Sequence, residues 1–161
     1  MMIFRPGVHL VHSAARVLQG AGVTDAFTLT ATTTGAGQTV TLDRMCPVGG
    51  DITIAWGDGN STVVNAGDTA AKTNVYAAAG SYSITVTPAS RIQQIDLHDA
   101  KLSGLNTAQS AAAPVTYFRC YSLATPCTVD STHMAGWTPG SWYLYSMPAG
   151  TYNIDSADMA G

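Results

Sequence analysis

Charged residues are scarce in this sequence. They make up 11% of its 161 residues, against roughly 25% in an average soluble protein, and the net charge is −3. The seven Lys and Arg residues are scattered, so the basic patch that marks a nucleic-acid-binding protein is missing, and we expect no nucleic-acid partner. Ala, Gly, Ser and Thr fill the gap, which favours a β-rich extracellular or virion protein over a cytosolic enzyme.

Long apolar runs are also missing. No stretch approaches the ~20 apolar residues that cross a bilayer, so we expect no membrane span. Residues 1–22 are interrupted by Arg, His and Pro and lack the apolar core of a secretion signal. A surface-type protein without such a signal has either lost it in processing or is assembled inside a cell and released by lysis, as phage particles are.

Cysteine is present in an odd number, because Cys46, Cys120 and Cys127 are the only three. An odd count is a poor disulfide framework, and the spacing between Cys120 and Cys127 is not that of a zinc-binding pair. We interpret all three as reduced, mostly buried thiols. A Cys120–Cys127 bridge across a loop is the alternative.

Residues 1–24 are expected to form an N-terminal arm with at most a short helix. Apolar residues recur at helical spacing from Val11 to Leu18, Ser13 could cap the helix, and Gly20 could end it. Such an arm would either pack on the following domain or dock onto a neighbouring subunit.

Residues 25–88 contain short runs in which apolar and polar residues alternate. In the run 26–34, Phe27, Leu29 and Ala31 fall on one side. Similar runs cover residues 39–45, 51–56 and 81–88. Period-two runs separated by Gly and Asn predict an antiparallel β-sandwich, in which each run is one strand.

The tetrad Trp56, Gly57, Asp58 and Gly59 interrupts this pattern directly after a strand. Glycine permits positive φ, and Asp tolerates it while bonding to nearby backbone, so the tetrad predicts a tight turn onto the run 61–64. Trp56 would be the large apolar anchor of the core, and Asp58 would hold the loop through hydrogen bonds. We therefore interpret Asp58 as a structural residue.

A second set of residues completes a familiar pattern downstream of this turn. The set is Tyr76, Gly80, Tyr82, Ile84 and Val86. With W-G-D-G, it resembles the PKD-like family of immunoglobulin-like β-sandwiches. The resemblance implies an immunoglobulin-like fold over 25–88 and a role as a spacer or adhesive module.

Residues 89–161 contain an internal repeat. The stretch 121–137 is echoed by 145–161, with Tyr121 matched by Tyr145 and Val129 by Ile154. A regular period of this kind indicates a solenoid, in which each unit stacks on the next. We expect the strands 118–123 and 142–147 to stack, each followed by one helical turn that begins at Asp130 or Asp155.

The repeat resembles a degenerate leucine-rich repeat of the kind that follows a W-G-D-G module in bacterial surface and phage tail proteins. The resemblance implies a short leucine-rich-repeat-like β-solenoid over 89–161, with 90–113 as an irregular first coil. A solenoid needs a terminal cap, so we expect another chain to cover its C-terminal end or the chain to continue.

The densest polar cluster is D-L-H-D, with Asp96, His98 and Asp99. An acid–base or metal site would need a third convergent group, and none can be named. The G-D-G turn could offer only Asp51 and Asp58 to a Ca²⁺ ion that takes six to eight oxygens. We therefore predict no catalytic residue, no metal site and no cofactor.

Aromatic residues crowd the last third of the chain. The candidates for an interface or a glycan contact are Tyr117, Tyr121, Trp137, Trp142, Tyr143 and Tyr145. In the run 141–145, Trp142 and Leu144 alternate with Tyr143 and Tyr145, so one set should face the core and the other solvent. An outward set could stack on sugar rings or fill a protein interface.

These observations favour a non-enzymatic structural or adhesive component of a phage particle, such as a tail, fibre or decoration protein. Its expected partners are copies of itself, other virion proteins and a host-surface polysaccharide, and its expected location is the virion. The alternative is a fragment of a bacterial adhesin at the cell surface. A glycan-active enzyme would need two carboxylates roughly 5–10 Å apart, and only Asp130 and Asp155, the expected capping residues, recur.

Overall fold

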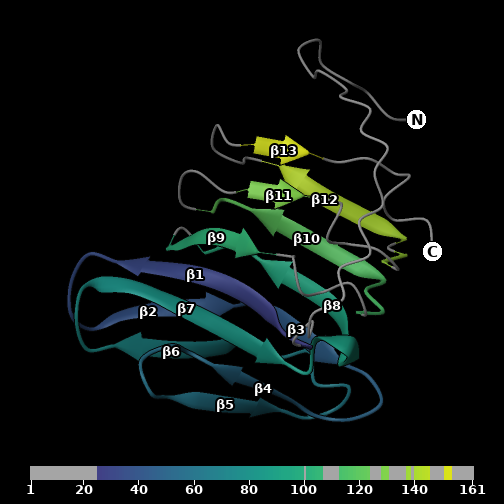
Figure 1. Ribbon diagram of the computed structural model, residues 1–161, viewed down its shortest axis with the longest axis horizontal. Helices are drawn as coiled ribbons and strands as arrows, with labels where there is room; N and C mark the ends of the chain where they lie inside the picture. Colours follow the sequence, from purple (N-terminus) through teal and green to yellow (C-terminus); the bar gives the residue numbers. More distant parts are fainter. Residues whose placement is uncertain are drawn as a thin grey trace, which may run out of the picture.

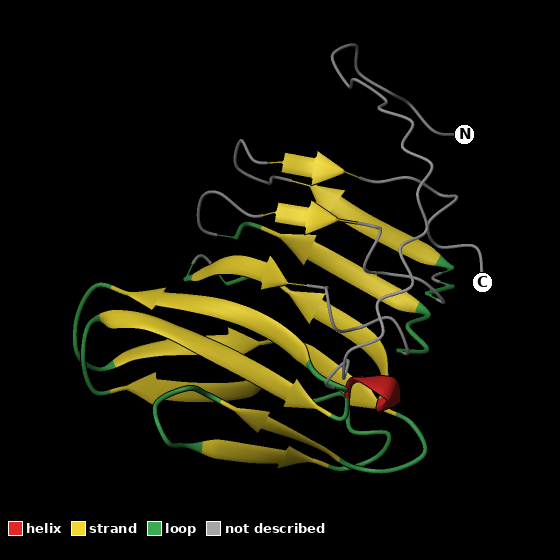
Figure 2. Ribbon diagram, viewed as in Figure 1, coloured by secondary structure: helices red, strands yellow, loops and turns green. Residues whose placement is uncertain are grey.

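The computed structural model describes residues 25–99, 101–106, 113–123, 128–130, 137–138, 140–145 and 151–153. Within these ranges every element is a β-strand except η1, a short 3₁₀ helix at Ala89–Arg91 (Figures 1 and 2). The predicted mainly-β fold is confirmed, and the open, layered sheets are consistent with a β-sandwich. The arm expected over 1–24 lies outside the described residues. No helix in the described part is long and apolar enough to cross a membrane.

The strands before residue 88 form one antiparallel sheet and several further pairings. They are β1 (Phe27–Thr33), β2 (Gln38–Leu42), β3 (Arg44–Pro47), β4 (Ile52–Ala55), β5 (Ser61–Val64), β6 (Lys72–Tyr76) and β7 (Gly80–Thr87). The sheet has the order β5-β4-β7-β1, and β2 pairs with β6. Phe27, Leu29 and Ala31 are buried in β1, so the alternation predicted there is confirmed.

The run 39–45, expected to be one strand, is instead divided at Asp43. β2 pairs with β6, whereas β3 pairs with β8 (Ile92–Leu97) in a different sheet. Leu42 and Met45 are both buried, and their odd spacing breaks the period-two alternation. The chain therefore passes from one sheet to the other at Asp43.

All but one of the strands after residue 88 pair in parallel with one another. Besides β8, the strands after residue 88 are β9 (Leu102–Asn106), β10 (Tyr117–Tyr121), β11 (Thr128–Asp130), β12 (Ser141–Tyr145) and β13 (Thr151–Asn153). Tyr117 of β10 lies opposite Gln94 of β8 on one side and opposite Ser141 of β12 on the other. Tyr121 pairs with Tyr145, which confirms the predicted stacking of these two strands.

The structure differs from the sequence repeat in two respects. Each unit contains a second short strand, β11 or β13, that the sequence repeat did not predict. In addition, Val129 pairs with Tyr152 and not with Ile154, its match in the sequence repeat. The helical turns expected after Asp130 and Asp155 fall on residues outside the described ranges.

Strands from both sides of residue 88 pair with one another. β9 extends the first sheet by pairing antiparallel with β1, and β8 pairs antiparallel with β3 (Figure 1). Buried apolar side chains from Phe27 to Trp137 form one core cluster. Residues far apart in the sequence therefore share one sheet, β12-β10-β8-β3.

Two of the cysteines are buried, as expected. Cys46 is a buried free thiol, and Cys120 lies fully buried in β10. Burial raises the pKa of Cys46, which keeps this thiol protonated at neutral pH. Cys127 lies outside the described residues, so the alternative Cys120–Cys127 bridge stays a prediction.

Tyr76 gives the fold a testable response to alkaline pH. Its ring is fully buried, its hydroxyl donates to the Trp56 carbonyl at 2.8 Å, and burial raises its pKa to about 12. Because the unfolded chain ionises near pH 10, this contribution to stability is complete below pH 10 and lost as pH rises towards 12. Urea unfolding of the wild type and of Tyr76→Phe across this range should show that the free energy of unfolding falls more steeply with rising pH in the wild type. Parallel profiles would contradict the burial of this hydroxyl.

Candidate functional site

The residues predicted to form a tight turn lie between β4 and β5. Gly57 has a φ of +81° and Gly59 a φ of +96°, both in the region that glycine adopts without steric cost. The Trp56 amide donates to the carbonyl of Asn60 at 3.0 Å across the turn. Asp58 lies exposed between the two glycines.

The Asp58 carboxylate is engaged by neighbouring residues of the turn and of β6. Its Oδ1 accepts from the backbone amide of Asn60 at 3.0 Å, and its Oδ2 accepts from the side-chain amides of Asn60 at 3.0 Å and Asn74 at 2.7 Å. Desolvation alone would raise the pKa of Asp58, but these hydrogen bonds outweigh it and the pKa lies below its usual value. The carboxylate therefore ties the turn to β6.

Trp56 anchors the turn in the core. Its side chain is 1% exposed, and its indole N–H donates to the Thr62 hydroxyl at 2.9 Å. A buried indole N–H needs such a partner, because an unpaired buried donor is costly. The W-G-D-G tetrad thus joins β4, β5 and β6 through contacts within the protein.

A different region presents aromatic and charged side chains together. In β10, Phe118 and Cys120 are buried, and they alternate with Tyr117, Arg119 and Tyr121, which are partly exposed. Side chains alternate between the two faces of a strand, so the exposed three share the face of the sheet that points away from the core.

Neighbouring strands continue this face. Arg119 lies opposite Asp96 of β8 and Tyr143 of β12, and Asp96 lies opposite Arg44 of β3. We call this surface the outer face and define it by Arg44, Gln94, Asp96, His98, Tyr117, Arg119, Tyr121 and Tyr143. It combines residues from both sides of residue 88 in a single flat array.

Asp96 is the buried acid of the outer face, with 2% of its surface exposed. The Arg119 guanidinium binds the Asp96 carboxylate through two nitrogens: Nε donates to Oδ1 at 2.8 Å, and Nη2 donates to Oδ2. Such a two-pronged pair is among the stronger side-chain contacts, and the bond to Asp96 raises the pKa of Arg119 further. Both oxygens of Asp96 are therefore occupied.

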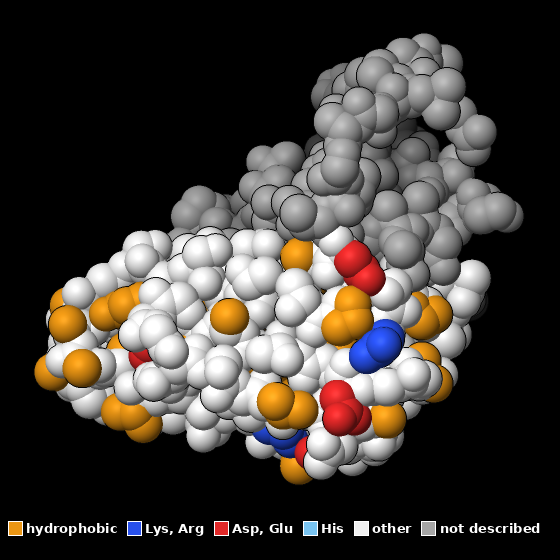
Figure 3. Space-filling view, turned by 60° about the horizontal axis from the view of Figure 1, so that its bottom comes forward, with side chains coloured by type: hydrophobic (Ala, Val, Ile, Leu, Met, Phe, Trp, Pro, Cys, Tyr) orange, Lys and Arg blue, Asp and Glu red, His pale blue; other side chains and the backbone are white. Residues whose placement is uncertain are grey.

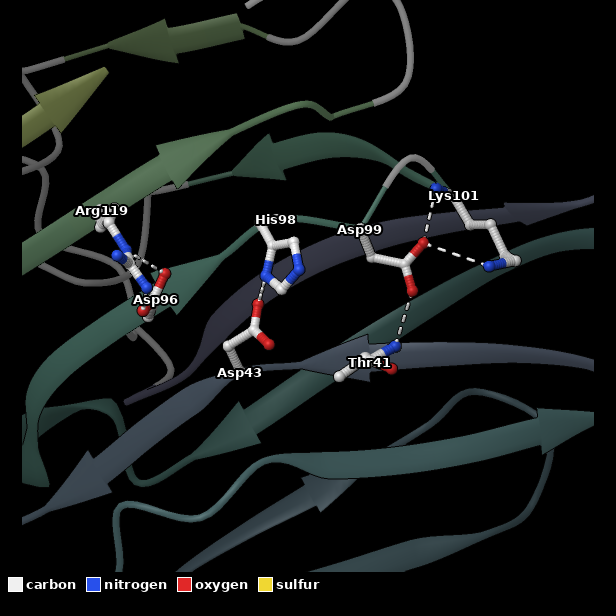
Figure 4. Close-up of polar contacts among 7 residues, drawn as sticks. All are labelled: Thr41, Asp43, Asp96, His98, Asp99, Lys101 and Arg119. Carbon is white, nitrogen blue, oxygen red and sulfur yellow. Dashed lines mark hydrogen bonds and ion pairs between the residues drawn. The ribbon is translucent and has the colours of Figure 1, made fainter. Parts of the chain in front are cut away.

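The other polar residues of D-L-H-D have different partners. Nδ1 of His98 contacts a carboxylate oxygen of Asp43, the residue at the β2–β3 corner. Asp99 accepts from the backbone amides of Thr41 and Lys101, each at 2.9 Å. Figure 4 shows these contacts, together with the Asp96–Arg119 pair, directed to separate partners.

The D-L-H-D cluster therefore does not converge on one point, as an acid–base or metal site would require. Across the described ranges, no group of three His, Cys, Asp or Glu residues could hold a metal ion. The chemistry this arrangement supports best is recognition at a surface.

Several predicted aromatic residues lie on the outer face. The Arg44 guanidinium lies 5.6 Å from the centre of the Tyr117 ring. The centres of the Tyr117 and Tyr143 rings are 6.3 Å apart, and the two rings are tilted relative to each other. The Arg119 guanidinium lies 5.2 Å from the Tyr121 ring centre. Tyr143 is 47% exposed, so it is the most accessible of these rings.

The remaining aromatic candidates are placed differently. Trp137, considered for a surface contact, is 1% exposed and packs on Phe118 at 5.4 Å, so it is a core residue. It follows β11 outside any strand, where no alternation indicates its direction. Trp142 and Tyr145 lie in β12 opposite Phe118 and Tyr121, and their side chains are outside the described part.

Sequence reasoning missed the arginines of this face. Arg119 stands between Tyr117 and Tyr121 in an alternating run, a signal that could have placed it beside them. Arg44 has no such signal, because its partner Gln94 is 50 residues away in the sequence.

No family model matches the chain, and no curated protein or solved structure matches it. A function is therefore inferred from the outer face and the fold.

Proposed function

We propose that this protein is a non-enzymatic structural or adhesive component of a phage particle, such as a tail, fibre or decoration protein. The observation that carries the proposal is the outer face, where aromatic rings and arginines lie together on one side of a four-stranded sheet. Tyr and Arg are enriched where proteins bind other molecules.

The pairing of charged groups also supports binding over catalysis. Asp96 is held by Arg119, His98 by Asp43, and Asp99 by backbone amides. A general acid or base must meet the substrate at hydrogen-bond distance, whereas these groups meet one another. We propose that they keep the outer face rigid.

The finer fold belongs to the same proposal. Residues 25–88 would be an immunoglobulin-like, PKD-type sandwich, supported by the W-G-D-G turn and the antiparallel sheet. Residues 89–161 would be a leucine-rich-repeat-like solenoid, supported by the parallel pairing of β10 with both β8 and β12. Such modules act mainly as spacers and adhesive units.

The partners proposed are copies of the same chain, other virion proteins and a host-surface polysaccharide. β12 and β13 each pair on one side only within the described residues, and an open strand edge favours contact with another chain. The surface is weakly charged, and Figure 3 shows few charged side chains among scattered hydrophobic and neutral ones on the face drawn.

Light scattering after size-exclusion chromatography tests the structural part of the proposal. We expect the purified chain to assemble in a concentration-dependent manner. A glycan array then tests adhesion, with binding to host-type polysaccharides expected. A strictly monomeric chain that binds no glycan would contradict the proposal.

A fragment of a bacterial cell-surface adhesin is the second candidate. The weakly charged surface suits it equally, because both settings expose the protein outside the cell. An antibody against the chain separates the two: detection in gradient-purified particles supports the virion, and detection in the cell envelope supports the adhesin.

A further inference from the structure

Arg44 is the arginine of the outer face that forms no ion pair within the described part of the chain. Its Nη1 donates to the neutral amide oxygen of Gln94 at 3.2 Å, and its buried Nε has no hydrogen-bond partner there. No ion pair joins Arg44 to an acid within the described residues. Asp96 lies opposite Arg44 in the ladder, but both of its oxygens bind Arg119.

This arrangement leaves the Arg44 guanidinium without a carboxylate bonded to it among the described residues. Arg44 is partly withdrawn from water, and such a charge gains most from an anionic partner. A planar guanidinium matches a carboxylate best, since two parallel hydrogen bonds can form. The partner that suits the outer face is therefore an anion, and a carboxylate in particular.

The rings beside Arg44 indicate what carries that carboxylate. Tyr121 is engaged by Arg119 and by His98, whose ring lies parallel to it at 4.9 Å. Tyr143 is 47% exposed. The Tyr117 ring contacts Arg44 and also lies next to the Tyr143 ring. An exposed tyrosine next to polar groups can stack on the apolar face of a sugar while its neighbours bind hydroxyls.

We propose that the outer face binds a carboxylated oligosaccharide, with a sugar ring on Tyr143 and a carboxylate at Arg44. Tyr117 separates the two contacts, so the ligand spans more than one sugar unit. The inference rests on the proposed adhesive function and names the class of glycan. A protein partner is the other possible occupant of this face, and the experiment below distinguishes it from a glycan.

Calorimetry with the full chain tests this assignment. The probes are an oligogalacturonate and its methyl ester of equal length, in which each carboxylate is replaced by a neutral methyl ester. We expect the acid to bind at least about tenfold more tightly, because a charged hydrogen-bonded pair is worth that factor or more. Arg44→Gln should remove this preference, and Arg44→Lys should restore part of it.

Matched controls separate the site from general charge effects. Lys72→Gln removes the same charge from a residue paired with Asp68 in another region, so the preference should persist. Tyr143→Ala should weaken binding of both probes, whereas Val75→Ala, at another exposed position, should not. Circular dichroism must show that each variant is folded.

Three results would overturn the inference: equal binding of acid and ester, no binding of either, or an acid preference that survives Arg44→Gln. Binding of neutral glycans alone would leave the adhesive function standing and remove the carboxylate site. Loss of self-assembly in Arg44→Gln without any effect on sugar binding would assign the face to a protein partner.

Discussion

Replacing Trp56 with alanine is expected to destabilise the protein by about 3–5 kcal/mol, the cost typical of truncating a core aromatic residue. The side chain is 1% exposed, so its removal leaves a cavity. The change also removes the donor that bonds the Thr62 hydroxyl. Since many domains are stable by only about 5–15 kcal/mol, this loss is a large share of the free energy of unfolding.

Urea unfolding followed by far-ultraviolet circular dichroism measures this effect without relying on the fluorescence of the deleted residue. Asp58→Asn is the control within the same turn. Asp58 is exposed and an amide keeps one of the two acceptor oxygens that Asn60 and Asn74 use, so we expect a loss below about 1 kcal/mol. A Trp56→Ala variant as stable as Asp58→Asn would show that Trp56 is not a core anchor.

Gly57→Ala is expected to be the second most damaging change, at about 2–5 kcal/mol, from overpacking and backbone strain together. A Cβ at Gly57 would lie 2.5 Å from the carbonyl oxygen of Ser83, which belongs to the central strand β7. The φ of +81° adds strain for any side chain. Overpacking costs about 1–3 kcal/mol and left-handed backbone about 1–2 kcal/mol, and neither can relax without moving β7.

Gly59→Ala is the matched control for this prediction. Gly59 has a φ of +96°, but no atom lies within 4 Å of a Cβ built there. It should therefore lose only the backbone contribution, about 1–2 kcal/mol. Equal losses in the two variants, measured by the same urea unfolding, would contradict the close approach of β7 to the turn at Gly57.

Local features of this fold could be predicted from sequence because local physics determines them. β1 alternates cleanly, since one of its faces lies on the core. The W-G-D-G letters indicate a turn because its two glycines tolerate positive φ. Tyr121 and Tyr145 are equivalent residues of a repeat, and equivalent strands of a stack pair with each other.

Features that depend on distant pairing could not be predicted in this way. β3 pairs with β8 in a different sheet from β2, a contact between segments about 50 residues apart that no local pattern specifies. For the same reason Arg44 and Asp43 were missed, although both complete the charged contacts around the outer face. Residues around Trp137 do not alternate, so the sequence does not indicate whether its side chain is buried. Trp137 is buried because it packs against Phe118, a residue of a different segment.

The central claim is that both sides of residue 88 build one core and one outer face. Backbone hydrogen exchange on the full chain, read by mass spectrometry, tests it most directly. We predict that β8 and β10 are protected to the same degree as β1 and β7, because β9 pairs with β1 and β8 with β3. Fast, independent exchange of β8 and β10 beside a protected β1 and β7 would contradict the claim.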